Sequence, residues 1–187
     1  MNLPDDRIFA ARDPLPVKPD DAPFVLVYHG TLARRLGLDI AIRAIARARA
    51  EVPSIEFRVI GAGEEREALI ALRDELGLGD AVSFSKGFVP VQDVPRLIAD
   101  ADVGVVPLRI GSGTDIMLPT KLLEYVTIGI PCIAPKTATI GRYFDDTMVQ
   151  FFDAEQVDSL AAAMVSLHRD PQRRSALLLH RGKLRLG

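Results

Sequence analysis

Short apolar runs alternate with amphipathic stretches along most of this chain. Residues 24–29 read FVLVYH and residues 55–60 read IEFRVI, and each run precedes a glycine turn and a helix-length stretch. After the first run, apolar residues recur at Leu38, Ile42 and Ile45, which is the spacing of one helix face. A short, mostly apolar run is typical of a strand buried on both faces, as strands of a parallel sheet are.

The same alternation continues almost to the end of the chain. It predicts strands at residues 24–29, 55–60, 81–84, 103–107, 132–134 and 148–152. It predicts helices at residues 38–50, 64–76, 92–99, 119–129 and 157–167, and a last basic helix from Pro171. This order favours an α/β fold of three layers, in which helices cover both faces of a parallel sheet. Residues 1–22, with four prolines and many charges, are interpreted as an extended lead-in, and residues 23–187 as one domain.

Ligands of such sheets bind beyond the carboxyl ends of the strands. The loops expected at that edge are residues 29–35, 61–64, 85–91, 107–119 and 135–142. Candidate chemistry is therefore expected in these loops and in the helices that follow them.

The most informative stretch is residues 115–131, which read DIMLPTKLLEYVTIGIP. Pro119 suits the start of a helix, where no amide partner is needed. The N-terminus of a helix attracts anions, so Lys121 in the first turn predicts a phosphate site. Glu124 either accepts hydrogen bonds from ribose hydroxyls or pairs with Lys121. Asp115, in a loop of glycine and serine, is either a sugar contact or an ordinary loop carboxylate.

Two glycine turns follow the first two predicted strands. In the first, HGTLARR at residues 29–35, Gly30 lets the backbone approach a ligand. Arg35 and the arginine before it either clamp a diphosphate or are solvated. The second turn, at residues 61–64, is followed by Arg66 where a dinucleotide fingerprint has its third glycine, which favours an ordinary strand-to-helix turn.

Composition and charge narrow the function classes. The chain has 187 residues, enough for one sizeable core, and a net charge of -2, which argues against nucleic acid as a partner. Its one cysteine, Cys132, lies in an apolar run and indicates a reducing compartment. No signal peptide and no apolar run of roughly 18 residues is present, so a cytoplasmic location is expected. No metal-ligand spacing or Ser-His-Asp set is found, and His29 is interpreted as structural.

Four segments of the chain form a recognisable series. They are HGTLARRLGLDIAIRAIA at 29–46, FRVIGAGEEREAL at 57–69, VSFSKGFVPVQDVPRLIADADVGVVPL at 82–108 and LPTKLLEYVTIGIPCIAP at 118–135. In this order and spacing they resemble the C-terminal, donor-nucleotide-binding domain of GT-B glycosyltransferases, in particular family 4 (glycosyl transferases group 1). The resemblance covers nearly the whole chain.

The resemblance implies a Rossmann-like sheet that holds the nucleoside diphosphate of an activated sugar. It implies phosphate contacts from the first glycine turn and from the start of the helix at 119–129, by Gly30, Thr31, Arg35 and Lys121. It implies base and ribose contacts from the loop after the third strand and from the same helix, by Gly87, Phe88, Val89 and Glu124.

The sequence departs from the family pattern at two places. The first glutamate of the family's glutamate pair falls on Ile116. Asp115 is its candidate substitute by a one-residue shift, as a catalytic contact to the donor sugar. The usual arginine and lysine of the first glycine loop fall on Thr31 and Leu36, and Arg35 is the candidate that supplies the charge instead.

The resemblance therefore implies the donor-binding half of a retaining glycosyltransferase that uses a nucleotide-sugar and needs no metal or cofactor. GT-B enzymes have an N-terminal acceptor domain, which is missing here, so this chain is expected to be inactive alone, whether it is an isolated half or a truncated gene product. The acceptor is unknown, and peripheral membrane contact is expected only through the missing half.

Two alternatives to this interpretation remain. One is a non-catalytic Rossmann-like domain for protein association, which Ile116 motivates, and the other is an NAD-dependent enzyme, which Arg66 disfavours.

Overall fold

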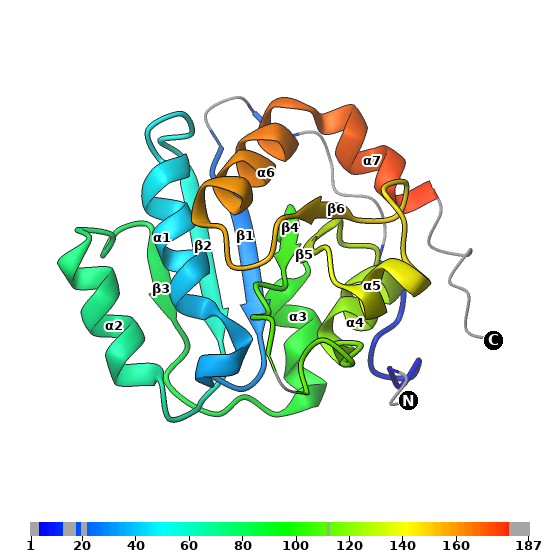
Figure 1. Ribbon diagram of the computed structural model, residues 1–187, viewed down its shortest axis with the longest axis horizontal. Helices are drawn as coiled ribbons and strands as arrows, with labels where there is room; N and C mark the ends of the chain where they lie inside the picture. The colour runs from blue at the N-terminus through cyan, green and yellow to red at the C-terminus, as the bar shows by residue number, and fades with distance from the viewer. Residues whose placement is uncertain (1–3, 13–17, 20–21, 112, 180–187) are drawn as a thin grey trace.

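The chain folds around one parallel sheet, shown in Figure 1. The computed structural model describes residues 4–12, 18–19, 22–111 and 113–179. Its strands are β1 Phe24–His29, β2 Ile55–Ile60, β3 Val82–Phe84, β4 Val103–Val105, β5 Cys132–Pro135 and β6 Gln150–Phe152. They are ordered β3-β2-β1-β4-β5-β6, and every neighbouring pair is parallel. The α/β fold predicted from the alternation is confirmed.

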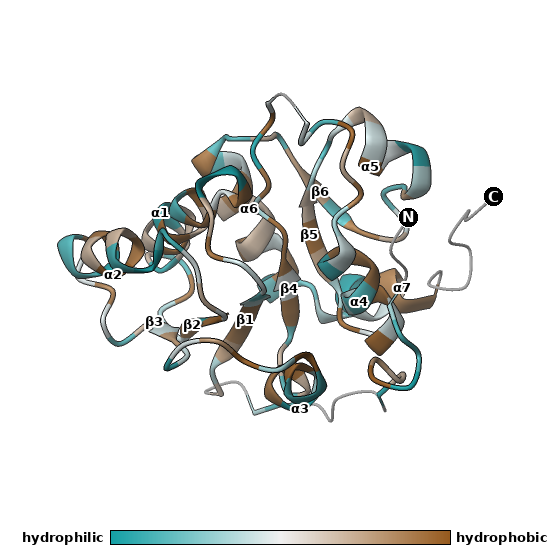
Figure 2. Cartoon of the chain, turned by 90° about the horizontal axis from the view of Figure 1, so that it is seen from below, coloured by the Kyte–Doolittle hydropathy of each residue, from teal (hydrophilic) through white to brown (hydrophobic). Residues whose placement is uncertain are grey.

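Helices connect the strands and cover both faces of the sheet. They are α1 Leu38–Ala48, α2 Arg66–Glu75, α3 Val94–Ile98, α4 Thr120–Ile128, α5 Ala138–Tyr143, α6 Val157–Arg169 and α7 Pro171–Leu179. Two 3-10 turns, η1 Arg34–Leu36 and η2 Val91–Asp93, precede α1 and α3. Figure 2 shows the brown strands between α1, α2 and α6 on one side and α3 and α4 on the other. Among the described residues, no helix is long and apolar enough to cross a membrane.

The middle strand β1 shows why its sequence has no polar alternation. Phe24, Leu26 and Tyr28 belong to the core between the sheet and the layer of α1 and α6. Val25 and Val27 belong to the second core, beneath α3 and α4. Because successive side chains of a strand point to opposite faces, both sets must be apolar when both faces are covered.

The order in which strands are added reverses at β1, because β2 and β3 follow on one side of it and β4, β5 and β6 on the other. The register of β1 with β4 covers Leu26 and Val27, which face Val103 and Gly104, before β1 ends at His29. The hydroxyl of Tyr125, from α4, lies at this point, where it donates to the Val27 carbonyl at 3.1 Å and accepts from the His29 amide at 3.2 Å. A crevice at such a switch point is the usual ligand site of an open α/β sheet.

Two sequence predictions need correction. The loop expected at residues 135–142 contains the short helix α5, which starts with a side-chain cap in which Thr137 accepts from the amide of Ile140 at 3.1 Å. A threonine at the cap position was the available signal, but only two turns follow it. The helix expected at residues 92–99 begins as the 3-10 turn η2 before α3.

The described part of the lead-in packs against the domain. Phe9 is buried in the core beneath α3 and α4. The backbone amide of Arg12 donates to the carbonyl of Ile128 at 2.8 Å, and its guanidinium donates to the carbonyl of Ala101 at 3.0 Å. The segment from Phe9 to Arg12 is therefore attached to the end of α4 and the start of β4.

The Tyr125 hydroxyl gives a prediction about stability. Tyr125→Phe should lower the free energy of unfolding by about 1–3 kcal/mol, because it leaves a buried amide and a buried carbonyl without their partner. Urea denaturation measures this. Tyr143→Phe is the matched control, since the Tyr143 hydroxyl makes no hydrogen bond with the described residues, and its effect should stay within about 0.5 kcal/mol. Equal effects of the two substitutions would contradict the assigned role.

Candidate functional site

A cavity of about 640 Å³ opens at the carboxyl ends of β1 and β2. It lies between the first glycine turn, the loop that leads into α3, and the N-terminus of α4. Seven of the nine residues predicted for the site line it, namely Gly30, Thr31, Arg35, Phe88, Val89, Lys121 and Glu124. The remaining two, Gly87 and Asp115, do not. Residues from three separate segments thus meet at the edge that the topology predicts.

The glycines of the first two turns allow the backbone to pack closely. Gly61 has φ +143°, and a Cβ on it would lie 1.9 Å from the Gly30 carbonyl oxygen. A Cβ on Gly63 would lie 2.2 Å from the Leu32 carbonyl oxygen. Gly30 itself has φ +120°, and a Cβ on it would lie 3.4 Å from Cε of Lys121. The second turn therefore serves the packing of the protein's own backbone, while at Gly30 the positive φ, rather than the space beside Lys121, favours glycine.

Lys121 lies in the first turn of α4 and is half-buried. Its Nζ lies 4.7 Å from the centre of the Tyr28 ring, and among the described residues it has no hydrogen-bond or ion-pair partner. Burial lowers the pKa of Lys121 to about 8; the charge of Glu124 opposes this shift and that of Arg35 adds to it. No side chain caps the start of α4, whose N-cap is Pro119. A cation and a helix N-terminus therefore face the cavity together.

Glu124, one turn further along α4, lies against His29 at the end of β1. The distance from His29 Nε2 to Glu124 Oε2 is 3.3 Å, and both side chains are largely buried. Burial raises the pKa of Glu124, and Lys121 opposes that rise. Burial, with help from Lys121, lowers the pKa of His29 to about 3, so the imidazole is neutral at physiological pH. The sequence alone had assigned His29 only a structural role.

The loop before α3 forms the opposite wall. The hydroxyl of Ser85 accepts from the Gly61 amide at 2.9 Å and donates to the Gly87 carbonyl at 2.9 Å, which ties this loop to the second glycine turn. Phe88 projects with 81% of its surface exposed, and Val89 packs against the core beneath α3 and α4. An exposed aromatic ring over a cavity is suited to stacking on a planar ligand.

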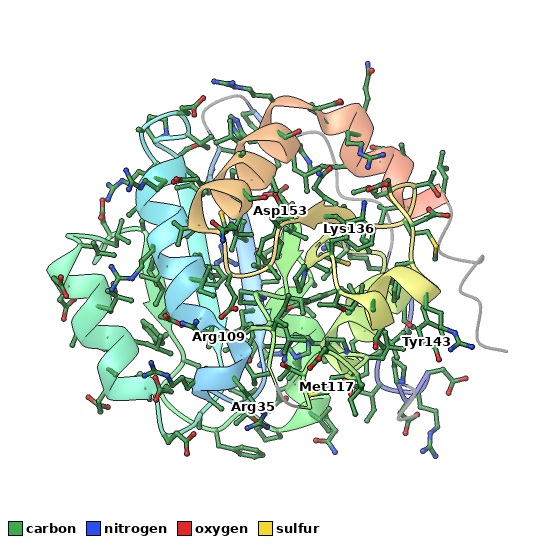
Figure 3. All side chains as sticks on the ribbon, viewed as in Figure 1. Arg35, Arg109, Met117, Lys136, Tyr143 and Asp153 are labelled. Atoms are coloured by element: carbon green, nitrogen blue, oxygen red, sulfur yellow. The ribbon has the colours of Figure 1, made fainter. Side chains whose placement is uncertain are left out.

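Arg35 and the loop before α4 form the rim. The Arg35 guanidinium has no partner among the described residues and also borders a smaller neighbouring cavity. Asp115 is exposed and lies outside the main cavity, with its backbone carbonyl accepting from the Thr139 hydroxyl at 2.6 Å. Ile116 is 80% exposed, and Met117, which sequence analysis did not single out, lines the cavity. Figure 3 shows Arg35 and Met117 at the lower edge of the molecule.

The site can bind an anion at one end and accept hydrogen bonds from hydroxyl groups at the other. Lys121, Arg35 and the first amides of α4 provide the positive end, and Glu124 provides acceptors next to it. Within the described ranges, no group of three or more His, Cys, Asp or Glu side chains could hold a metal ion.

The fold and the cavity define a Rossmann-like α/β domain with its pocket at the switch point. The chain belongs to the glycosyl transferases group 1 family, whose model matches residues 23–170. The GDP-mannose-dependent alpha-(1-6)-phosphatidylinositol monomannoside mannosyltransferase of Mycolicibacterium smegmatis is 32% identical over 161 residues, which are 82% of this chain and 41% of that protein. The putative colanic acid biosynthesis glycosyltransferase WcaL of Escherichia coli K12 is 28% identical over 143 residues, 72% of this chain and 35% of that protein. The chain thus spans less than half the length of these relatives.

Solved structures of glycosyltransferases have the same fold. Anabaena HepE, in complex with UDP, matches with a TM-score of 0.78 and 18% identity over 97% of this chain and 50% of its own. The C-terminal domain of the group 1 protein LpcC from Francisella tularensis matches with a TM-score of 0.73 and 16% identity over 96% and 94%. The resemblance to a GT-B C-terminal domain is therefore confirmed at the level of the family and the fold.

The burial of Lys121 should lower the free energy of unfolding, and this effect can be measured. Its pKa is about 8 in the folded chain against the ordinary 10.5, so the unfolded chain binds more protons between these values. Stability should therefore rise with pH across this window, and the full penalty should apply below pH 8. Lys121→Met should raise the free energy of unfolding at pH 7 by about 1–3 kcal/mol, with a smaller gain near pH 10.

The control for this measurement is Lys136→Met, at an exposed lysine that stands over Phe151 and lies outside the cavity lining. It should leave stability nearly unchanged in urea titrations at both pH values. A Lys121→Met chain that is no more stable than the unaltered chain at pH 7 would contradict the assigned penalty.

Proposed function

We propose that this chain is the donor-binding half of a retaining, metal-independent glycosyltransferase that transfers a sugar from a nucleotide-sugar. In this proposal the acceptor site belongs to an N-terminal domain outside this sequence, and the chain alone binds nucleotide without catalysis. The acceptor is left open, any contact with a membrane surface is assigned to that other domain, and the enzyme acts in the cytoplasm.

The observation that carries the proposal is the position of the Lys121 cation at the cavity wall. A half-buried ammonium group that lacks a hydrogen-bond or ion-pair partner among the described residues is unfavourable until an anion reaches it. The N-terminus of α4 and the guanidinium of Arg35 also border this cavity, and neither has a side-chain partner among the described residues. A diphosphate satisfies all three groups at once, since each of its phosphates offers several acceptor oxygens.

The remaining contacts follow from this placement of the diphosphate. Gly30 and Thr31 let the first turn approach the phosphates, and Glu124 accepts hydrogen bonds from the ribose. The base lies in the loop of Gly87, Phe88 and Val89, where the exposed ring can stack on it. When the glycosidic bond to the diphosphate breaks, negative charge develops on the leaving phosphate, and Lys121, Arg35 and the helix amides stabilise it.

The donor sugar is the least constrained part of the proposal. Asp115 is its candidate contact, although in this structure it faces solvent outside the cavity. Relatives that depend on GDP-mannose and neighbours solved with UDP make GDP and UDP the first nucleotides to test.

Isothermal titration calorimetry of this chain with UDP, GDP and ADP tests the proposal. We expect weak binding of one of them, and we expect Lys121→Met to abolish it through loss of the charge, while Lys136→Met retains it. No heat for any of the three would overturn the proposal for this chain. If light scattering then shows a stable oligomer, the non-catalytic association domain becomes the better interpretation.

The pKa of Lys121 gives a second test, on the same ligand. The charged form binds the diphosphate, so affinity should fall about twofold between pH 7 and pH 8 and by a factor that approaches about tenfold per pH unit at higher pH. Titrations at pH 8.5 in two buffers of different ionisation enthalpy should show proton uptake on binding. Affinity that is unchanged between pH 7.5 and 9.5 would be inconsistent with a phosphate contact by Lys121.

A further inference from the structure

His29 is a buried polar group that the proposed nucleotide contacts do not use. Only 6% of its side chain is exposed, yet it lines the cavity. Its Nε2 has no hydrogen-bond partner among the described residues, although Glu124 Oε2 lies 3.3 Å away. At this separation a small rotation of either group makes the hydrogen bond.

The surroundings of the ring hold its orientation. The Tyr125 ring meets it edge-on, with centroids 5.0 Å apart and planes at 86°, and the Phe9 ring stacks at 6.4 Å. The titratable groups around the His29 ring are Lys121, Glu124 and Tyr125. The charge of Lys121 disfavours a positive imidazole. With its pKa lowered to about 3, the ring carries a single proton at physiological pH.

That single proton has two possible positions. If it is on Nδ1, the lone pair of Nε2 points at the Glu124 carboxylate, and two acceptors oppose each other in a buried place. If it is on Nε2, the ring donates to the carboxylate, and Lys121 opposes the rise in the pKa of Glu124 that burial causes. The second arrangement satisfies both buried groups, while the first leaves both unsatisfied.

We propose that His29 is a positioning residue that donates from Nε2 to Oε2 of Glu124 and so leaves Oε1 of Glu124 to accept from a ribose hydroxyl. This inference rests on the proposed function, in which Glu124 contacts the ribose. It makes the pair a device for selecting ribonucleotides, because a carboxylate fixed at one oxygen is ordered before the sugar arrives. The ordered carboxylate does not increase the affinity for a nucleotide that lacks ribose hydroxyls.

The tautomer is tested first, without any ligand. Long-range ¹H–¹⁵N correlation spectra of the ¹⁵N-labelled chain report which imidazole nitrogen carries the proton, and the His29 signals are identified by their absence in His29→Gln. We expect a neutral ring with the proton on Nε2 at pH 7. A neutral ring with the proton on Nδ1, or a doubly protonated ring, would overturn the inference whatever the chain binds.

The second test compares two substitutions that differ in where they place an amide. In His29→Gln the side-chain amide would stand near the position of Nε2, so this variant should keep the donor and most of the affinity. The shorter side chain of His29→Asn reaches only the position of Nδ1, so affinity for the nucleoside diphosphate that binds should fall about tenfold. Thermal unfolding of both variants establishes that they are folded.

The decisive ligand is the 2′,3′-dideoxy form of the same nucleoside diphosphate. His29→Asn should bind it as well as the unaltered chain does, because the affected contact is to the missing hydroxyls. An equal loss for both ligands would mean a merely structural role and would overturn the inference while leaving the proposed function intact. If no nucleoside diphosphate binds the unaltered chain, the proposed function fails, and with it the ribose role, although the tautomer test still reports on the pair. A variant that does not fold is replaced by Glu124→Gln, which should likewise lose affinity for the ribose form and bind the dideoxy form as well as the unaltered chain does.

Discussion

The hydroxyl of Tyr125 holds together the two segments from which the site is built. It joins the backbone of β1 to α4 where the pairing of β1 with β4 ends, and these segments are almost a hundred residues apart in sequence. Gly104 makes the contact possible, because a Cβ there would lie 2.5 Å from the tyrosine ring. With α4 fixed in this way, Lys121 lies over the Gly30 turn and Glu124 against His29. The positions of both charges are thus consequences of one buried hydrogen-bonded contact.

The loops around this contact are interlocked through backbone rather than side chains. A Cβ on Gly37 would lie 2.0 Å from the Pro107 carbonyl oxygen, and the Arg109 amide donates to the Arg35 carbonyl at 3.2 Å. The first turn is therefore in contact with the loop that follows β4 on one side and with Gly61 on the other. A rigid edge of this kind suits recognition of a phosphate, since donors that are already in place need no ordering when the ligand arrives.

Much of the architecture could be predicted from the sequence, because burial on both faces of a parallel strand leaves a clear apolar run. The bounds of β1 and β2 match the predicted residues 24–29 and 55–60. The short helix α5 was missed because two turns are too few for a period to emerge. The contact between His29 and Glu124 could not be predicted, since neither residue has a local signal and only the crossing of α4 over β1 brings them together. Asp115 shows the opposite case, in which proximity in sequence to α4 does not place a side chain in the cavity.

The two ends of the cavity have opposite electrostatic requirements. Lys121 is held where burial disfavours its charge, and Glu124 one turn away is disfavoured in the same manner. Their mutual attraction lessens both penalties, but they make no ion pair, because Glu124 faces His29 instead. This separation keeps a donor end and an acceptor end apart along the same helix. A ligand that carries negative charge at one end and hydroxyl donors at the other satisfies both ends, and a simple anion satisfies only the first. The arrangement of the charges therefore favours a phosphorylated sugar, such as a nucleotide, over inorganic phosphate.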